Sequence, residues 1–318
     1  MIESSPRCRA LTAAFIAASV VAPMTGAARP AAVPAPVPRP LVPLRAATPA
    51  ALAVRYAESR DGMRAAERMA AGHGDRWRAA MLRAMADPAR TFLFFDGRDG
   101  GRAAEVFGEL PDAERIAVLV PGAGTSLDRY GLLRGGAMRL RQEIGDRSAV
   151  IAWLGYRTPS TVSLATLTPG RADEAVPYLR AFVRELGTVR PAARVFLLCH
   201  SYGSVVCARA ASRLDVDGIV LFGSVGTTAG TVAELHTRAA VWAGRGTGDW
   251  TARVPNTRLR LPFATIGFGA DPLSPAFGAR VFAAGDGGHS DYLRPGVALD
   301  NIARIVTGQA PSEGSRGA

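Results

Sequence analysis

The chain of 318 residues carries 38 Lys plus Arg against 27 Asp plus Glu, a formal net charge of +11, and 48% of its residues are hydrophobic. This composition excludes a disordered chain and allows two domains of about 150 residues or one α/β domain of about 250. The sequence contains no lysine, which excludes Schiff-base chemistry, a Ser-Lys dyad and a lysine-dependent phosphate loop.

The first 28 residues have the pattern of a signal peptide. Arg7 and Arg9 precede an apolar run over residues 10–22, and small residues over 25–28 suit a signal peptidase. The run is too short for a comfortable membrane span. We therefore expect a secreted or cell-envelope protein with no stable membrane span beyond an uncleaved leader. A cytoplasmic protein with an Ala-rich extension is the alternative.

The sequence divides into a leader and one folded unit. Residues 29–49 are rich in Ala and Pro, which favour neither helix nor sheet, and are predicted to form a disordered tether. Residues 50–308 are predicted to form a single domain, and residues 309–318 a flexible tail. The arginines of the domain are interleaved with acids and form no basic tract with aromatics, so we expect no nucleic-acid partner.

From residue 49 the pattern alternates helix and strand. Continuous apolar runs of five or six residues are typical of strands buried on both faces of a parallel sheet. We predict a mainly parallel central sheet with helices on both faces, preceded by amino-terminal helices. The predicted strands are 91–95, 115–120, 149–154, 194–198, 218–222, 239–242 and 280–283, and the predicted helices are 49–72, 75–86, 172–186, 229–238 and one beginning near 295.

The two cysteines of the predicted domain, Cys199 and Cys207, lie eight residues apart across a strand-to-helix junction. We expect Cα separation and side-chain direction to forbid a disulfide there, and we interpret both as small buried apolar side chains. Cys8 falls in the leader. Three cysteines with this spacing also predict no structural metal site.

Ser201 lies where a predicted strand runs directly into a helix. A serine on so tight a turn needs small residues two positions before and two after it, and Cys199 and Gly203 fill those places. This pattern indicates a nucleophile turn. The alternative is an incidental serine at a strand-to-helix connection.

A nucleophilic serine in acyl transfer also needs amide donors for the developing oxyanion. We assign one to the backbone of Tyr202 and the other to Ala123, in the loop after strand 115–120. Gly122 and Gly124 flank Ala123 and would let the backbone approach a substrate closely. Taken alone, this loop could equally cradle a phosphate or turn the chain.

The base and the acid follow in the order Ser, acid, His that accompanies such a turn. His289 is the best of four histidines, because it lies just past the last predicted strand; His236 is placed in a helix, and His200 is expected to point away from the serine. Among the acids that precede His289, we choose Asp249, which follows strand 239–242. The alternatives are Asp271, interpreted as a turn initiator, and Asp286, which is close enough to bond its own turn.

These motifs resemble those of the α/β-hydrolase superfamily, and in particular the uncharacterised DUF1023 group. The resemblance extends over residues 50–308, and the usual motif has glycine where this chain has Cys199. It implies an α/β-hydrolase fold and a serine hydrolase, and it points to the same acid, Asp249. The matching segments are 94–97, 101–103, 120–126, 152–156, 200–204, 277–282 and 288–292.

We therefore expect a serine hydrolase that acts on a small-molecule carboxylic ester or related acyl substrate through Ser201, His289 and Asp249. Acyl transfer by the same residues, and a catalytically silent binding protein, are the alternatives. Trp153 and Tyr156 follow a strand end and are candidates for lining the substrate pocket, although Trp153 could instead be plain core. The acyl-enzyme route requires no cofactor.

Overall fold

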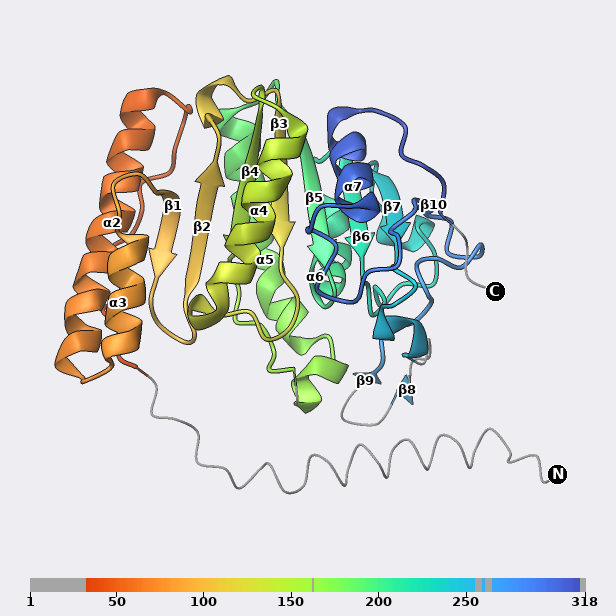
Figure 1. The fold of residues 1–318 in the computed structure, drawn as a ribbon, viewed down its shortest axis with the longest axis horizontal. Helices are drawn as coiled ribbons and strands as arrows, with labels where there is room; N and C mark the ends of the chain where they lie inside the picture. The colour runs from red at the N-terminus through yellow and green to blue at the C-terminus, as the bar shows by residue number, and fades with distance from the viewer. Residues whose placement is uncertain (1–32, 162, 255–258, 261–264, 315–318) are drawn as a thin grey trace.

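The computed structural model describes residues 33–161, 163–254, 259–260 and 265–314 (Figure 1). The predicted signal peptide and Cys8 lie outside these residues. The helices are α2 (Pro49–Gly72), α3 (Arg76–Met85), α4 (Tyr130–Ile144), α5 (Gly170–Val189), α6 (Gly203–Ala210) and α7 (Val297–Thr307). The strands are β1 (Thr91–Asp96), β2 (Arg102–Phe107), β3 (Arg115–Val120), β4 (Ser148–Leu154), β5 (Arg194–His200), β6 (Gly218–Phe222), β7 (Ala240–Gly244), β8 (Leu259–Arg260), β9 (Thr265–Ile266) and β10 (Arg280–Val281).

The central sheet has eight strands in the order β1-β2-β4-β3-β5-β6-β7-β10. Strands β4, β3, β5, β6, β7 and β10 are parallel, whereas β2 is antiparallel to both β1 and β4. The mainly parallel sheet is therefore confirmed, with an antiparallel hairpin at one edge. The carboxyl ends of β3, β5 and β7 come to the same edge of the sheet, where ligands of such sheets bind.

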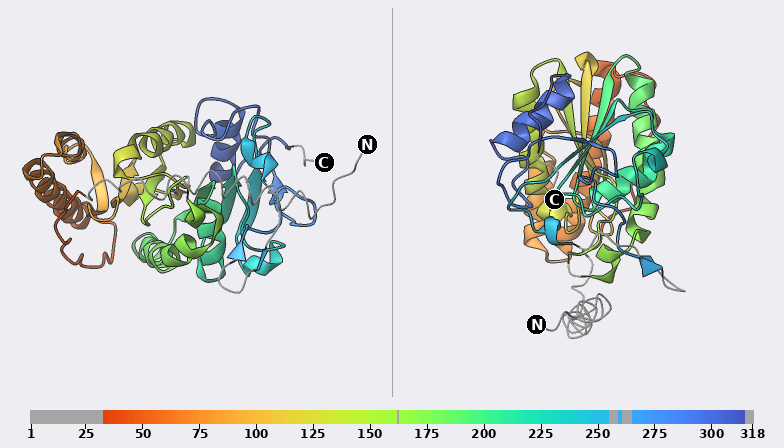
Figure 2. Two further views of the ribbon diagram at one scale, coloured as in Figure 1. Left: turned by 90° about the horizontal axis from the view of Figure 1, so that it is seen from below. Right: turned by 90° about the vertical axis from the view of Figure 1, so that its right-hand side faces the viewer.

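Helices cover both faces of the sheet, as the sequence predicts. Figure 2 shows α4 and α7 on one face and α5 and α6 on the other. Two apolar cores follow from this layering, one beneath α5 and α6 and the other beneath α4 and α7. Helices α2 and α3 lie beside β1 at the edge of the molecule (Figure 1). No helix in the described ranges is long and apolar enough to cross a membrane.

The segments that flank the domain contact it. The described part of the expected tether is residues 33–49, of which 33–48 contain no helix or strand and Pro49 begins α2. The Leu44 N–H donates to Glu185 on α5 at 2.9 Å, and Ala47 is buried. At the other end, in the expected tail, the Ser312 N–H donates to the Asn301 side chain on α7 at 3.0 Å. Both segments are thus held at the domain surface over the residues described.

Two local predictions differ from the structure. The sequence analysis predicts no strand over 102–107, where β2 lies; this segment is poor in β-branched residues and carries Glu105, which is buried. The helix predicted over 229–238 is wrong, since only Ala233–Leu235 form a single 3-10 turn. His236 then adopts a left-handed conformation with φ of 48°, which ends that turn.

Candidate active site

Ser201 lies on the turn between β5 and α6. Its φ of 53° is in the left-handed region, which residues with a side chain rarely adopt and which characterises a strained nucleophile turn. The Ser201 N–H donates to the Phe222 carbonyl oxygen on β6 at 3.1 Å. Gly203 is required two residues later, because a Cβ there would lie 2.5 Å from the Val120 carbonyl oxygen. The turn therefore holds Ser201 at the carboxyl edge of the sheet.

A disulfide joins Cys199 on β5 to Cys207 in α6, so the expectation of two unpaired cysteines is wrong. The turn at Ser201 reverses the chain, and α6 packs back on β5. The Cα atoms of Cys199 and Cys207, eight residues apart in the sequence, are therefore only 6.4 Å apart, a distance that a disulfide spans. Both cysteines are buried, as expected, and the bridge ties together the two elements that hold the serine.

His289 lies on the loop between β10 and α7, with its ring beside Ser201. Its Nε2 is 2.9 Å from Ser201 Oγ, and its Nδ1 is 3.0 Å from Asp249 Oδ1. A carboxylate can only accept, so Nδ1 carries the proton and Nε2 is left to accept the serine hydroxyl. The structure therefore brings together the three residues that the sequence analysis selected, in the order serine, imidazole, carboxylate.

Asp249 follows β7 and begins the short helix Trp250–Arg253. Its side chain is fully buried and accepts from the Thr251 N–H at 2.8 Å as well as from His289. Burial alone would raise its pKa, but hydrogen bonds from His289, Tyr292 and Thr251 outweigh burial and hold the pKa of this carboxyl well below its usual range. Asp249 is therefore ionised at neutral pH and able to stabilise a protonated His289.

Tyr292 is a further member of this network that the sequence analysis did not assign. Its hydroxyl donates to Asp249 Oδ2 at 2.5 Å and accepts from the Gly246 N–H at 3.1 Å. Burial and the bond to Asp249 raise the pKa of Tyr292 well above its usual value. The sequence signals for it are its position three residues after His289 and its place in the matching segment 288–292. We call Ser201, His289, Asp249 and Tyr292 the Ser201 cluster.

Gly122 lies directly beside the serine. A Cβ at this position would lie 2.6 Å from the Ser201 Cβ and 3.1 Å from its Oγ, so only glycine permits the approach. The Gly124 N–H donates to the Pro159 carbonyl oxygen at 2.8 Å, which fixes the loop. Over the ranges that the structure describes, the backbone N–H groups of Ala123 and Tyr202 have no acceptor in the protein. The loop and the turn at Ser201 therefore each leave one selected amide, that of Ala123 and that of Tyr202, without a protein acceptor among the described residues.

His200 contacts the Ser201 cluster at His289. Its Nε2–H donates to the His289 carbonyl oxygen at 2.8 Å, and the two imidazole rings lie 4.7 Å apart. Burial, with a smaller contribution from His289, lowers the pKa of His200 to about 4, so it is neutral near pH 7. This side chain fixes the backbone of His289, and no pattern in the sequence predicts that role.

Trp153 and Tyr156 occupy different places from one another. Trp153 is fully buried and lines a cavity between α2 and α5, while its ring lies 6.1 Å from that of Tyr156 in a stacked arrangement. The Tyr156 hydroxyl donates to the Pro121 carbonyl oxygen at 2.7 Å. Tyr156 thus supports the backbone just before Gly122, and Trp153 stacks against Tyr156.

The competing candidates lie elsewhere. Asp271 bonds to Arg245 at 2.5 Å and accepts from the Leu273 N–H at 3.0 Å, as a turn initiator does. Among the described residues, neither Asp271 nor Asp286 bonds to His289, and His236 is exposed. The same residues include no group of three His, Cys, Asp or Glu side chains arranged to hold a metal.

The comparisons with known proteins agree with this architecture. The family model described as alpha/beta hydrolase matches residues 96–259, and the chain belongs to this family, with an α/β-hydrolase fold. Two curated relatives from Mycobacterium tuberculosis, uncharacterised proteins Rv2079 (strain ATCC 25618 / H37Rv) and MT2140 (strain CDC 1551 / Oshkosh), are each 30% identical over 278 residues. The match takes in 73% of this chain but 41% of theirs, so the chain spans about two fifths of their length.

The chain is also similar, at lower identity, to solved structures. The esterase PE8 is 17% identical, with a TM-score of 0.45 over 64% of this chain and 97% of its own. The serine hydrolase XC6422 from Xanthomonas campestris, described as lacking a lid, is 16% identical, with a TM-score of 0.44 over 68% of this chain and 92% of its own.

Proposed function

We propose that the protein is a serine hydrolase that cleaves a carboxylic ester or related acyl substrate through an acyl-enzyme. One observation carries the proposal: the continuous hydrogen-bonded series from Ser201 Oγ through both ring nitrogens of His289 to Asp249. The strained turn that presents the serine and the low pKa of the Asp249 carboxyl support it. Such a series activates a hydroxyl that is otherwise a weak nucleophile.

In the first half of the reaction, Ser201 Oγ attacks the acyl carbon while His289 Nε2 takes the hydroxyl proton. The carbonyl oxygen becomes an oxyanion, which the N–H groups of Ala123 and Tyr202 stabilise. His289 then returns the proton to the leaving alcohol as the ester bond breaks. A water molecule, activated by His289 in the same way, hydrolyses the acyl-enzyme and releases the acid.

A fluorophosphonate probe tests this proposal directly. We expect the folded protein to form a covalent adduct and the Ser201→Ala variant to form none, while Ser212→Ala, an exposed control on another element, labels like wild type. Wild type should also hydrolyse a p-nitrophenyl ester faster than Ser201→Ala. A folded wild-type protein that neither labels nor turns over would favour a silent binding protein and contradict the proposal.

We also propose that the protein acts outside the cytoplasm and belongs to the DUF1023 group within its family. The leader pattern supports export, and the Cys199–Cys207 disulfide supports an oxidising compartment. Mass spectrometry of the native protein tests export: a mature chain that begins after about residue 28 is expected. An intact chain from Met1 in the cytosol would contradict it.

A further inference from the structure

A cavity lies away from the Ser201 cluster. Its volume is about 690 Å³, and it lies over β1, β2 and β4 between helices α2 and α5. Residues of the amino-terminal segment between Pro38 and Arg45 form part of its wall. Ligand cavities in proteins are commonly of about 300–1,000 Å³, so this one has the size of a small-molecule site. No member of the Ser201 cluster lines it.

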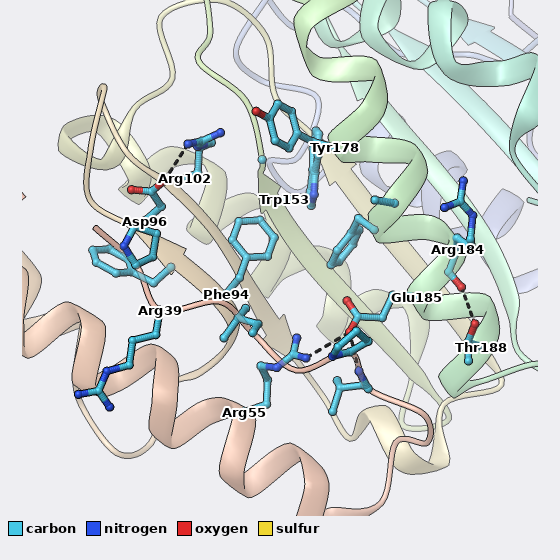
Figure 3. A pocket seen from close by; sticks show the side chains of 18 of the residues that line it. Arg39, Arg55, Phe94, Asp96, Arg102, Trp153, Tyr178, Arg184, Glu185 and Thr188 are labelled. Carbon is cyan, nitrogen blue, oxygen red and sulfur yellow. Dashed lines mark hydrogen bonds and ion pairs between the residues drawn. The ribbon is translucent and has the colours of Figure 1, made fainter. Parts of the chain in front are cut away.

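Five aromatic residues line the cavity: Phe94, Phe95, Trp153, Tyr178 and Phe182. Phe94 and Phe182 meet edge to face with ring centroids 6.0 Å apart, and Trp153 lies 6.2 Å from Phe182. Figure 3 shows Phe94, Trp153 and Tyr178 around one space. Tyr178 is 51% exposed and lies beneath the Arg102 guanidinium, at 5.2 Å. These surfaces favour a ligand with an apolar body, because burial of apolar area is stabilising at about 25 cal/mol per Å².

Inside the cavity the charges are paired. Arg55 is buried and bonds to Glu185 at 3.2 Å and to the carbonyl oxygens of Leu93 and Val42. Arg102 bonds to Asp96 at 2.7 Å. Arg98 also bonds to Asp96, at 2.9 Å, so Asp96 is shared by two arginines and this group keeps an excess of positive charge, whereas Arg55 and Glu185 balance one another.

The rim differs from the interior. Three more arginines line the cavity, Arg39, Arg45 and Arg184; all three are exposed, and within the described part of the chain none forms an ion pair. The lining residues thus include five arginines and only two acids, Asp96 and Glu185. An exposed excess of guanidinium groups around an apolar cavity attracts an anion and disfavours a cation.

We propose that this cavity is a second, non-catalytic binding site for an amphipathic anion: a molecule with a hydrocarbon or aromatic body and one anionic group. The body lies between Phe94, Trp153 and Phe182, and the anionic group lies at the rim with the unpaired arginines. The site does not depend on the proposed hydrolase activity, since it shares no residue with the Ser201 cluster.

The probe that tests this site is 11-bromoundecanoate, because bromine quenches tryptophan fluorescence at contact distance. We expect saturable quenching in wild type. Trp153→Phe should lose most of the quenching, whereas Trp250→Phe, a control whose ring lies 4.7 Å from that of His289 and outside the cavity, should retain it, which separates this site from the proposed active site. Quenching that does not saturate, or that persists in Trp153→Phe, would overturn the site.

Two further comparisons test its shape and its charge. Ala181→Phe, on the lining face of α5, should weaken binding at least about tenfold by filling the cavity, while Gly187→Phe on the same helix should not. Replacing Arg39, Arg45 and Arg184 by Gln should weaken carboxylate binding about tenfold and leave binding of 11-bromoundecanol unchanged. Equal affinity of wild type for the acid and the alcohol would overturn the anion preference.

Discussion

The Ser201 cluster and the cavity between α2 and α5 differ in how their polar groups are partnered. The carboxylate of Asp249 accepts from three donors, and both nitrogens of His289 are bonded. At the cavity rim, Arg184 and two arginines of the amino-terminal segment have no acid partner in the described residues. The cluster fixes individual atoms before any substrate binds, whereas the cavity offers volume and net charge. A single substitution in the Ser201 cluster should therefore have a large effect on activity, whereas a single substitution in the cavity should have a smaller effect on binding.

The largest expected effect is at His289. His289→Ala should retain the fold and lower kcat by several orders of magnitude, on the order of 10⁴ or more, because no other group accepts the Ser201 proton. His236→Ala is the matched control and should behave like wild type, since that side chain is exposed on a distant turn. Steady-state ester hydrolysis with circular dichroism checks both. Loss of activity in His236→Ala with retention in His289→Ala would show that the base is misassigned.

Asp249→Asn should be next in size. An amide at this position no longer holds Nδ1–H of His289 in the tautomer that leaves Nε2 free, and kcat should fall by about 10³–10⁴ with little change in KM. The matched control is Asp286→Asn, which lies three residues before His289 but does not bond to it in the described residues. If Asp286→Asn lost most of its kcat while Asp249→Asn kept nearly the wild-type kcat, the assignment of the acid would be contradicted.

The disulfide is the covalent part of the same region. Replacing Cys199 and Cys207 together by Ala should lower the free energy of unfolding by about 2–3 kcal/mol, since the bridge closes a loop of eight residues around Ser201. Denaturant unfolding of the oxidised wild type and the double variant measures this difference. The control is wild type under a reductant strong enough to open a buried bridge, which should approach the variant. Equal stability of all three would show that the bridge contributes nothing.

Tyr292→Phe should have a smaller effect that is confined to activity. It removes one of the donors to Asp249 and keeps the ring that packs against Phe222. We expect kcat to fall about tenfold, the value of one hydrogen bond to a charged group, with the KM nearly unchanged. The Asp249 carboxyl would lose one bond that lowers its pKa but keep its bonds from His289 and Thr251, so it should stay ionised at neutral pH and the loss should appear in kcat alone. An unchanged kcat in the folded variant would rule out this positioning role.

Much of the site was predictable because it depends on local pattern. Ser201 stands between a continuous apolar strand and a helix, and Asp249 and His289 each follow a strand end, so sheet topology alone brings them to one edge. The central strands of the sheet could be predicted from the sequence equally well. Buried parallel strands require unbroken apolar runs, and these runs appear in the sequence wherever the structure has β3 to β7.

The features that were missed depend on contacts that only the folded chain creates. Glu105 is buried in β2 because Arg90 bonds to it at 2.7 Å and Arg134 at 3.3 Å, and neither pairing is visible in the segment itself. The disulfide depends on the reversal of the chain at Ser201, which turns a separation along the sequence into a contact. Likewise the bond from His200 to the His289 backbone joins residues 89 positions apart.

The smallest expected effect concerns His200 and the dependence of stability on pH. Burial lowers its pKa from 6.5 to about 4, so between these values the unfolded chain binds a proton that the folded chain does not. The stability contribution is therefore present above about pH 6.5 and is lost as the pH falls toward 4. Its neighbours oppose one another: His289 disfavours protonation of His200, and Asp249 favours it.

In His200→Gln the fall in Tm between pH 7 and pH 4.5 should be smaller than in wild type by a few degrees. His236→Gln, exposed on its turn, should keep the wild-type slope. If Tm fell as steeply with pH in His200→Gln as in wild type, the His200 imidazole would not be buried in its neutral form in the folded protein, and the prediction would be wrong.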